Sequence, residues 1–277
     1  MTDLADRFDQ HRDHLTRVAY RMLGSQTEAE DAVQEAWLRL GRSDPAEVAN
    51  LGGWLTTVVA RVCLDELRAR RARREQALDE FTPEPIVRVE EGPEEQALLA
   101  DSVGIALLVV LETLTPAERL AFVLHDMFAV PFSEIAEILE RSPDAARQLA
   151  SRARRIVRGA APLPDPDVAR QRELVAAFLQ ASRDGDFDAL VSVLDPDVVF
   201  RVRGRVPAAT VHGAEEVARR VLQRGTPLAP LGRPAMVNGA PGVLVGPLEH
   251  PIAVAAFTVA NGRIVSLDVI VAPTLGS

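Results

Sequence analysis

The spacing of apolar residues predicts helices through the first 75 positions of the 277-residue chain. Apolar side chains recur there every three or four residues, as a helix with one buried face requires. Gly24 is placed to end the first of these helices, and Thr27 with Glu30 has the spacing of a capping box for the second. A block with the same helical period covers residues 94–159. The N-terminal half is therefore predicted to be all-α.

The pattern changes after residue 160, where three prolines in five positions exclude a helix interior. Helices are then predicted at about 168–182, 187–194 and 214–223. Short runs rich in Val, Ile and Ala predict strands at 198–202, 242–245, 252–259 and 263–270. Asn261-Gly262 lies between the last two runs and is a strong hairpin signal. This part of the chain is predicted to be an α+β domain with a curved antiparallel sheet.

Proline and acidic residues mark the domain boundaries. Residues 79–93 contain three prolines and several acidic residues, which is typical of a linker. We therefore expect a first domain at 1–78, the linker at 79–93, a second domain at 94–160 and a third at 161–277.

Composition excludes several classes of protein. The single cysteine, Cys63, cannot form an intramolecular disulfide, and the five scattered histidines do not suggest a metal site, so neither a metal nor a cofactor is expected. The longest apolar run, 105–111, is too short to span a membrane, and the polar N-terminus is unlike a secretory signal. We expect a cytoplasmic protein. Its net charge of −9 conceals two basic tracts, Arg61–Arg74 and Arg141–Arg158, with six arginines each.

Residues 133–158 have the pattern of a helix-turn-helix. A short amphipathic helix ends at Leu139, a three-residue turn follows, and Ser142 with Pro143 is a good start for a second helix. We expect the second helix to bury Ala145, Ala146, Leu149, Ala153, Ile156 and Val157. The residues expected to contact DNA are Ser142, Arg147, Gln148, Ser151, Arg152, Arg154 and Arg155. Arg and Gln can read base edges, and further arginines neutralise phosphates. An arginine-covered solvent face in an ordinary bundle is the alternative.

Three motifs in order resemble those of an extracytoplasmic-function (ECF) RNA polymerase sigma factor. Residues 26–39 resemble the helix that docks on the coiled-coil clamp of core RNA polymerase, and residues 53–68 resemble the segment that recognises and melts the −10 promoter element. Residues 115–158 resemble the domain for the −35 element, which would make the helix-turn-helix its reader. The resemblance implies two all-α sigma domains, core polymerase and promoter DNA as partners, and no catalysis.

The C-terminal part resembles a SigJ-type subgroup, in which a SnoaL-like (NTF2-like) cone domain follows the sigma domains. Pro83-Glu84-Pro85, residues 211–219 and residues 236–239 carry this resemblance. Two motifs of the subgroup are altered, at 201–205 and at the C-terminal end. A glycine is also usual where Glu140 stands, so Glu140 is expected to hold a left-handed conformation at a cost of about 1 kcal/mol.

The resemblance and the helical spacing together suggest two further sets of contact residues. The polymerase-docking stripe on one helix face is Asp31, Gln34, Glu35 and Leu38. The residues expected at the −10 element are Asn50, Arg61, Arg71, Arg73 and Arg74. A plain solvent-exposed face is the alternative for the docking stripe, and the arginines are expected to contact phosphates.

Several functions remain open for the third domain. By resemblance it is a built-in regulator, and we expect it to pack on residues 79–93 and on the sigma domains. An isomerase or cyclase is an alternative, with Asp195, Asp197, His212 and Asp268 as candidate acid–base residues, although no pair has a catalytic spacing. Any small ligand of this domain is unknown from sequence. For the whole chain, a polymerase-independent helix-turn-helix regulator is the other alternative.

Overall fold

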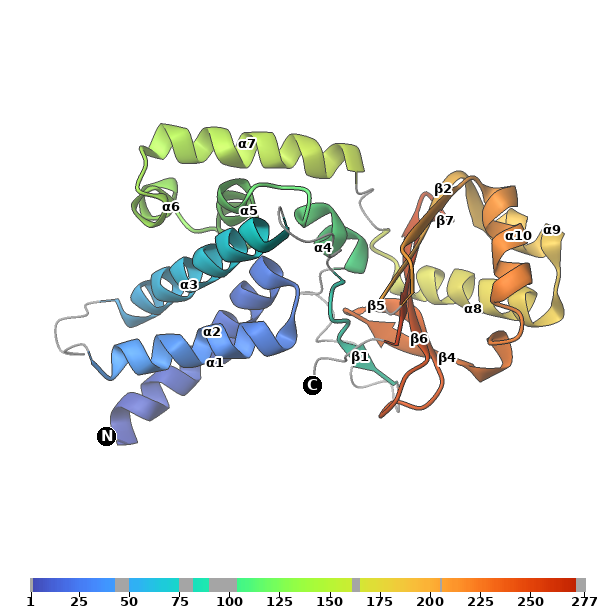
Figure 1. The fold of residues 1–277 in the computed structure, drawn as a ribbon, viewed down its shortest axis with the longest axis horizontal. Helices are drawn as coiled ribbons and strands as arrows, with labels where there is room; N and C mark the ends of the chain where they lie inside the picture. Colours follow the sequence, from blue (N-terminus) through green and yellow to red (C-terminus); the bar gives the residue numbers. More distant parts are fainter. Residues whose placement is uncertain are drawn as a thin grey trace. The chain divides into compact units, whose positions relative to one another are not determined.

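The computed structural model describes residues 2–42, 50–74, 82–89, 104–160, 165–204 and 206–272. The chain forms two compact units, and each unit is assembled from two separate stretches of sequence (Figure 1). The helical unit comprises Met1–Phe81 and Val110–Gly159, and the sheet unit comprises Thr82–Val109 and Ala160–Ser277. The segment expected to be a linker thus begins the sheet unit.

Three long helices begin the helical unit, as the apolar period predicts. They are α1 (Thr2–Leu23), α2 (Gln26–Leu40) and α3 (Leu51–Arg74). Gly24 follows α1 with φ +72°, which confirms it as the end of that helix. The cap of α2 lies two residues earlier than predicted, because the hydroxyl of Ser25, not Thr27, accepts the free backbone N–H of Glu28.

From residue 104 the second helical block also forms as predicted, with one irregular turn, and residues 94–103 lie outside the described residues. Its elements are α4 (Ile105–Leu111), α5 (Pro116–Phe122), the π-helical turn η3 (Val123–Met127), α6 (Phe132–Leu139) and α7 (Pro143–Ala160). Thr115 and Glu118 make a complete capping box at the start of α5.

The helix-turn-helix is confirmed in α6 and α7. The Ser142 hydroxyl accepts the backbone N–H of Ala145 and so caps α7. Glu140 ends α6 with φ +54° and ψ +47°, the left-handed conformation that was expected. The prediction for Ile156 was wrong, since it is 38% exposed. At 100° per residue, Ile156 lies about 90° around the helix from the buried stripe of alanines at 146, 150 and 153.

The described residues of the sheet unit form seven strands in the order β1-β4-β5-β6-β7-β2-β3. The strands are β1 (Val87–Arg88), β2 (Leu194–Gly204), β3 (Ala209–His212), β4 (Gly232–Val237), β5 (Ala240–Val245), β6 (Ala253–Ala260) and β7 (Arg263–Val271). Only β2 and β7 pair in parallel; the other neighbours are antiparallel. The α+β fold class is therefore confirmed. The pattern missed β1, β3 and β4.

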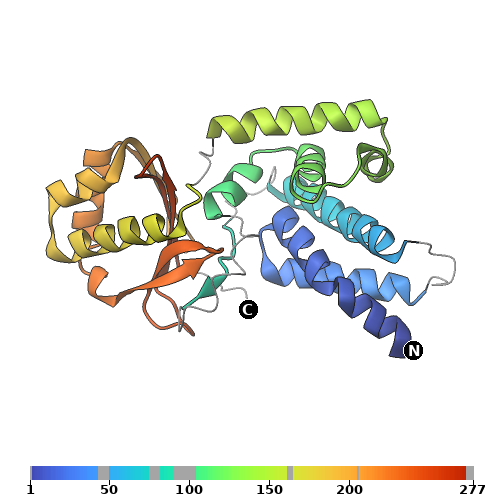
Figure 2. The same ribbon diagram turned by 180° about the vertical axis from the view of Figure 1, so that it is seen from behind.

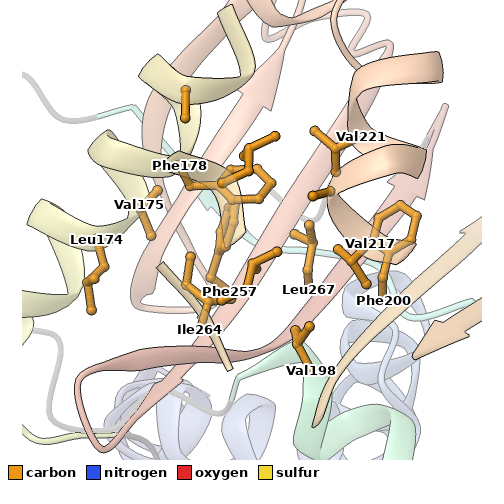
Figure 3. Packing of buried hydrophobic residues seen from close by; sticks show 14 of the residues in the cluster. Leu174, Val175, Phe178, Val198, Phe200, Val217, Val221, Phe257, Ile264 and Leu267 are labelled. Atoms are coloured by element: carbon orange, nitrogen blue, oxygen red, sulfur yellow. The ribbon is translucent and has the colours of Figure 1, made fainter. Parts of the chain in front are cut away.

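Three helices cover one face of this sheet, as both views show (Figures 1 and 2). They are α8 (Val168–Asp184), α9 (Phe187–Val193) and α10 (Ala214–Arg224), and the 3₁₀ turn η4 (Ala229–Leu231) leads into β4. Apolar side chains fill the space between sheet and helices (Figure 3). Phe178 of α8 meets Phe257 of β6 edge-on, with ring centroids 5.1 Å apart.

The predicted Asn-Gly hairpin is confirmed, and the beginning of the third domain holds it in place. Asn261 and Gly262 have φ +55° and +71°, as a type I′ turn requires. The carboxylate of Asp165 accepts the backbone N–H of both turn residues, at 3.0 and 2.9 Å. The Asp165 backbone N–H in turn donates to the carbonyl of Val259. These bonds hold Asp165, which precedes α8, against the turn that joins β6 to β7.

The short strand β1 attaches the predicted linker to the sheet. Val87 and Arg88 pair with Val237 and Met236 of β4. The backbone of Ile86 makes two further bonds to Asn238: its N–H donates to Oδ1 and its carbonyl accepts the Asn238 N–H, both at 2.8 Å. We expected the third domain to pack on residues 79–93, and this is confirmed for Ile86–Arg88.

Candidate polymerase and nucleic-acid interfaces

Helix α2 presents the predicted docking stripe as one continuous face. Its opposite face is buried through Ala29, Ala32, Val33, Ala36 and Leu40. Asp31, Gln34 and Leu38 are exposed, and Glu35 is half-exposed beside Arg39, which donates to it at 2.8 Å. Leu38 is 45% exposed, which is high for a large apolar side chain. An exposed leucine flanked by carboxylates suits a partner helix that offers an apolar contact and basic side chains.

The residues predicted for the −10 element lie along the whole of α3 and do not form one patch. Asn50 precedes the helix, and its Oδ1 accepts the backbone N–H of Gly53 at 3.0 Å, so it caps α3. Arg61, Arg71 and Arg73 are exposed, and Arg73 is paired with Glu66 at 2.6 Å. Arg74 ends α3, but its side chain is outside the described residues.

Helix α7 gathers most of the residues predicted for the −35 element on one exposed face. Arg147, Gln148, Ser151, Arg152 and Arg155 lie within a range of about 140° around the helix and are all exposed. Ser142 is exposed as well, at the cap position of the same helix. Arg147 is held in place by an ion pair with Asp144 and by stacking over Phe132, whose ring centroid is 5.4 Å away.

Arg154 departs from this set. Its Nε donates to the Asp126 carboxylate in η3 at 2.5 Å, and its side chain is only 30% exposed. Arg154 lies beside the buried alanine stripe of α7, about 100° from the centre of the arginine-rich face. This ion pair ties α7 to η3 and sets Arg154 apart from the exposed face, and its contact with DNA stays a prediction.

A cluster of charges that the sequence analysis missed lies inside the helical unit. Arg119 is 1% exposed and pairs with Glu112, which also lies 3.6 Å from Arg70. Burial lowers the pKa of Arg119, and the Glu112 carboxylate opposes that shift. The same surroundings raise the pKa of the buried Cys63 thiol to about 12, mainly through desolvation. No local motif connects these residues, because they come from α3, from the turn after α4 and from α5.

The candidate acid–base residues of the sheet unit are not brought together. Asp195 caps its own turn by accepting the N–H of Asp197, and Asp197 and His212 are exposed. Asp268 is buried, but it alternates along β7 with core residues Leu267 and Val269 and so points to the face away from the helices. Burial raises the pKa of Asp268, although Arg201 and Ser266 contact its carboxylate.

Two further properties of the described residues bear on function. None of their helices has both the length and the apolar character needed to cross a bilayer. Their histidine, cysteine and acidic side chains form no group of three or more that could hold a metal ion.

Comparisons with known proteins match both halves of the chain. Residues 7–73 match the model for Sigma-70 region 2, and residues 105–157 match the model for Sigma-70 region 4. The chain is 42% identical over 279 residues to the ECF RNA polymerase sigma factor SigJ of Mycobacterium tuberculosis, covering 94% of this chain and 89% of that protein. It is 35% identical to the probable ECF sigma factor SigI of the same species, covering 95% and 91%.

The similarity extends to the three-dimensional structure. The crystal structure of Mycobacterium tuberculosis SigJ superimposes with a TM-score of 0.78 at 39% identity, covering 97% of this chain and 96% of that one. The match therefore includes the sheet unit as well as the sigma regions. With both sigma regions present in order and a full-length relative at 42% identity, this chain belongs to the ECF RNA polymerase sigma factors.

Proposed function

We propose that this sigma factor docks on core RNA polymerase through the exposed face of α2 and reads promoter DNA through α3 and α7. The observation that carries the proposal is the exposed polar face of α7, on which Arg147, Gln148, Ser151, Arg152 and Arg155 lie together. Gln148 can pair with an adenine edge, and arginines can reach guanine edges or phosphates. The stripe of α2 offers an acidic and apolar contact at a separate place on the helical unit.

The first test is run-off transcription with purified core polymerase on genomic fragments. Specific transcripts that disappear when Asp31 and Leu38 are both replaced by alanine would support docking through α2. Gln26→Ala serves as a control at the start of the same helix, outside the stripe. If no form of the chain binds core polymerase but it binds a duplex tightly alone, a polymerase-independent regulator becomes the better description.

Replacing an α7 residue that contacts a base should change DNA binding differently from replacing one that contacts a phosphate. Replacing Gln148 by alanine should relax sequence preference at one position of the −35 element. Replacing Arg155 by alanine should weaken binding to all sequences and reduce the slope of log K against log salt by about 1, if it contacts a phosphate. Equal effects of both changes on all sequences would contradict the assignment of Gln148 to a base.

We further propose that the sheet unit regulates the sigma regions through the connector that joins them. Strand β1 anchors Ile86–Arg88 to β4, between α3 and α4 in the sequence. Because β1 anchors the connector, only a shorter stretch of chain joins the anchor to each sigma region. These shorter stretches limit how far region 2 and region 4 can separate.

The regulatory proposal is tested by weakening the attachment of β1 to β4. Asn238→Gly removes the side-chain bond to Ile86 without adding backbone strain, because Asn238 has φ +50°. Asn261→Gly is the matched control, since Asn261 has nearly the same φ but lies in the β6–β7 turn. Transcription by Asn238→Gly should shift toward that of a chain ending at residue 161. Transcription unchanged by both the truncation and Asn238→Gly would contradict regulation by this unit.

A further inference from the structure

The connection between η3 and α6 is a closed turn that places His125 next to the helix-turn-helix. The N–H of Ala129 donates to the carbonyl of His125 at 3.0 Å, and the N–H of Val130 donates to the carbonyl of Leu124 at 2.9 Å. These bonds bring the chain back on itself after the π-helical turn. His125 therefore lies beside Phe132, the first residue of α6.

The ring of Phe132 is stacked on the ring of His125. The two ring centroids are 3.8 Å apart, and the planes are inclined by 29°. The imidazole is itself held, because its Nδ1 donates to the carbonyl of Val130 at 3.1 Å and a carbonyl can only accept. Phe132 is half-buried, and a ring stacked on a second, anchored ring has little freedom to rotate. The two rings thus form a fixed surface at the start of α6.

This surface contacts one residue of the exposed polar face of α7. Helix α6 leads directly into the beginning of α7 (Figure 1). The guanidinium carbon of Arg147 lies 5.4 Å from the centre of the Phe132 ring, within the range of a cation–π contact. Its Nη1 donates to the carboxylate of Asp144, three residues earlier in α7. An exposed arginine without such contacts samples many rotamers and loses that freedom when it binds.

The contacts of Arg147 leave one edge of its guanidinium available. Asp144 engages Nη1, and no hydrogen bond within the described part of the chain engages Nε or Nη2. Nε and Nη2 form a planar fork of two N–H donors. Such a fork can donate to O6 and N7 of a guanine in the major groove. A guanidinium whose orientation is already set can meet those two atoms without a further search among rotamers.

We propose that His125 and Phe132 are positioning residues for promoter recognition, and that their stacked rings orient Arg147 to read one guanine of the −35 element. This inference rests on the proposed function, because it assumes that α7 reads that element. The rings act through Arg147. Loss of either ring should therefore weaken base preference at the position that Arg147 reads and leave the preference at the other positions unchanged.

The central variant is Phe132→Leu, which removes the aromatic face and keeps an apolar side chain at the start of α6. A cation–π contact at an exposed site is worth a factor of roughly two to five, so the preference for guanine should fall by about that factor. Phe132→Tyr keeps the ring and should retain the preference. Phe128→Leu is the matched control, because the same change falls on a ring that contacts His14 and Arg21 of α1.

A second variant tests the ring behind Phe132. His125→Leu removes the stacked imidazole and leaves the contact between Phe132 and Arg147 without its support. We expect it to weaken preference at the same position as Phe132→Leu, by a smaller factor.

The readout is binding of the holoenzyme, formed from core polymerase and the full-length chain, to a promoter identified by run-off transcription. Each −35 position carries each of the four bases in turn, and ratios of the apparent dissociation constants give the base preference at that position. Arg147→Ala identifies the position that Arg147 reads. Phe132→Leu added to Arg147→Ala should cause no further loss there, because the ring then has no guanidinium to orient.

A merely structural role of Phe132 would produce a different result. Phe132→Leu would then weaken binding to every sequence alike, or would match Phe128→Leu, and its effect would add to that of Arg147→Ala. Any of these results would overturn the proposal, as would an Arg147→Ala variant that keeps the base preference of the unmodified chain. In each case specific transcripts from the unmodified chain would leave the proposed function standing, whereas absence of transcripts and of polymerase binding would remove the proposed function itself.

Discussion

Glu140 holds a backbone conformation that its side chain disfavours, and this can be measured. It ends α6 at φ +54° and ψ +47°, where the β-carbon of a non-glycine residue crowds the following carbonyl. Its N–H bonds the carbonyl of Ala136, as does the N–H of Arg141 at 2.9 Å, so the turn is fixed by the end of the helix. The Glu140 side chain is exposed, so its removal sacrifices little packing.

Glu140→Gly should therefore stabilise the helix-turn-helix. Relief of the left-handed strain is worth about 1–2 kcal/mol, and the added freedom of glycine in the unfolded chain takes back about 0.5–1 kcal/mol. The net gain is then about 0.5–1 kcal/mol in the free energy of unfolding. With an m-value of about 2 kcal/mol/M, the urea midpoint should rise by about 0.4 M.

Urea unfolding followed by circular dichroism at 222 nm would measure this gain, with two companion variants. Glu140→Ala keeps the β-carbon and removes the charge, so its midpoint should match the unmodified chain. Glu140→Asn should fall between alanine and glycine, because asparagine tolerates the left-handed region. If Glu140→Gly and Glu140→Ala shift the midpoint equally, the charge and not the backbone is responsible, and the reasoning is refuted.

Three other changes have expected outcomes of similar clarity. Because burial raises the pKa of Cys63 to about 12, the thiol should resist alkylation at pH 8.5 in the native chain and react fully in urea. The folded state holds this proton more tightly than the unfolded state, so stability should be undiminished below about pH 9 and fall as the pH rises toward 12; Cys63→Ala should reduce that slope. Phe257→Ala should cost about 3–5 kcal/mol, because it empties the ring contact with Phe178 in the core of the sheet unit; Ile252→Ala, at an exposed position, should be nearly neutral in the same melt. Thr115→Ala should cost about 1 kcal/mol, because it removes the hydroxyl that accepts the Glu118 backbone N–H in the capping box, whereas Thr113→Ala, two residues earlier and outside the box, should cost less.

The sequence was most informative where one local rule decided the structure. The helical period located α1–α3 and α5–α7, and the pair Asn261-Gly262 located the β6–β7 hairpin because only such residues tolerate two positive φ angles in succession. Ser142 and Pro143 placed the start of α7 for the same kind of reason. The exposed stripe of α2 also followed directly from its spacing.

The features that the sequence did not reveal depend on partners far away along the chain. Strand β1 has two residues and exists because β4, about 150 residues later, offers a free edge. Arg154 is adjacent to Arg155 in the sequence, and its ion pair with Asp126, 28 positions earlier, is not visible in that local pattern. The pairing of Arg70 with Glu112 likewise needs α3 and the segment before α5 to be adjacent in space.

Because β4 lies about 150 residues after β1 in the sequence, the two paired strands are synthesised at different times. During synthesis Ile86–Arg88 leaves the ribosome about 150 residues ahead of the strand that will bind it. At about 5–20 residues per second this is an interval of roughly 7–30 s. For about the last 80 of these residues both sigma regions have been synthesised, whereas β4 has not yet been made and cannot pair with Ile86–Arg88. Each new molecule therefore lacks the anchor at first and acquires it only after β4 has been synthesised.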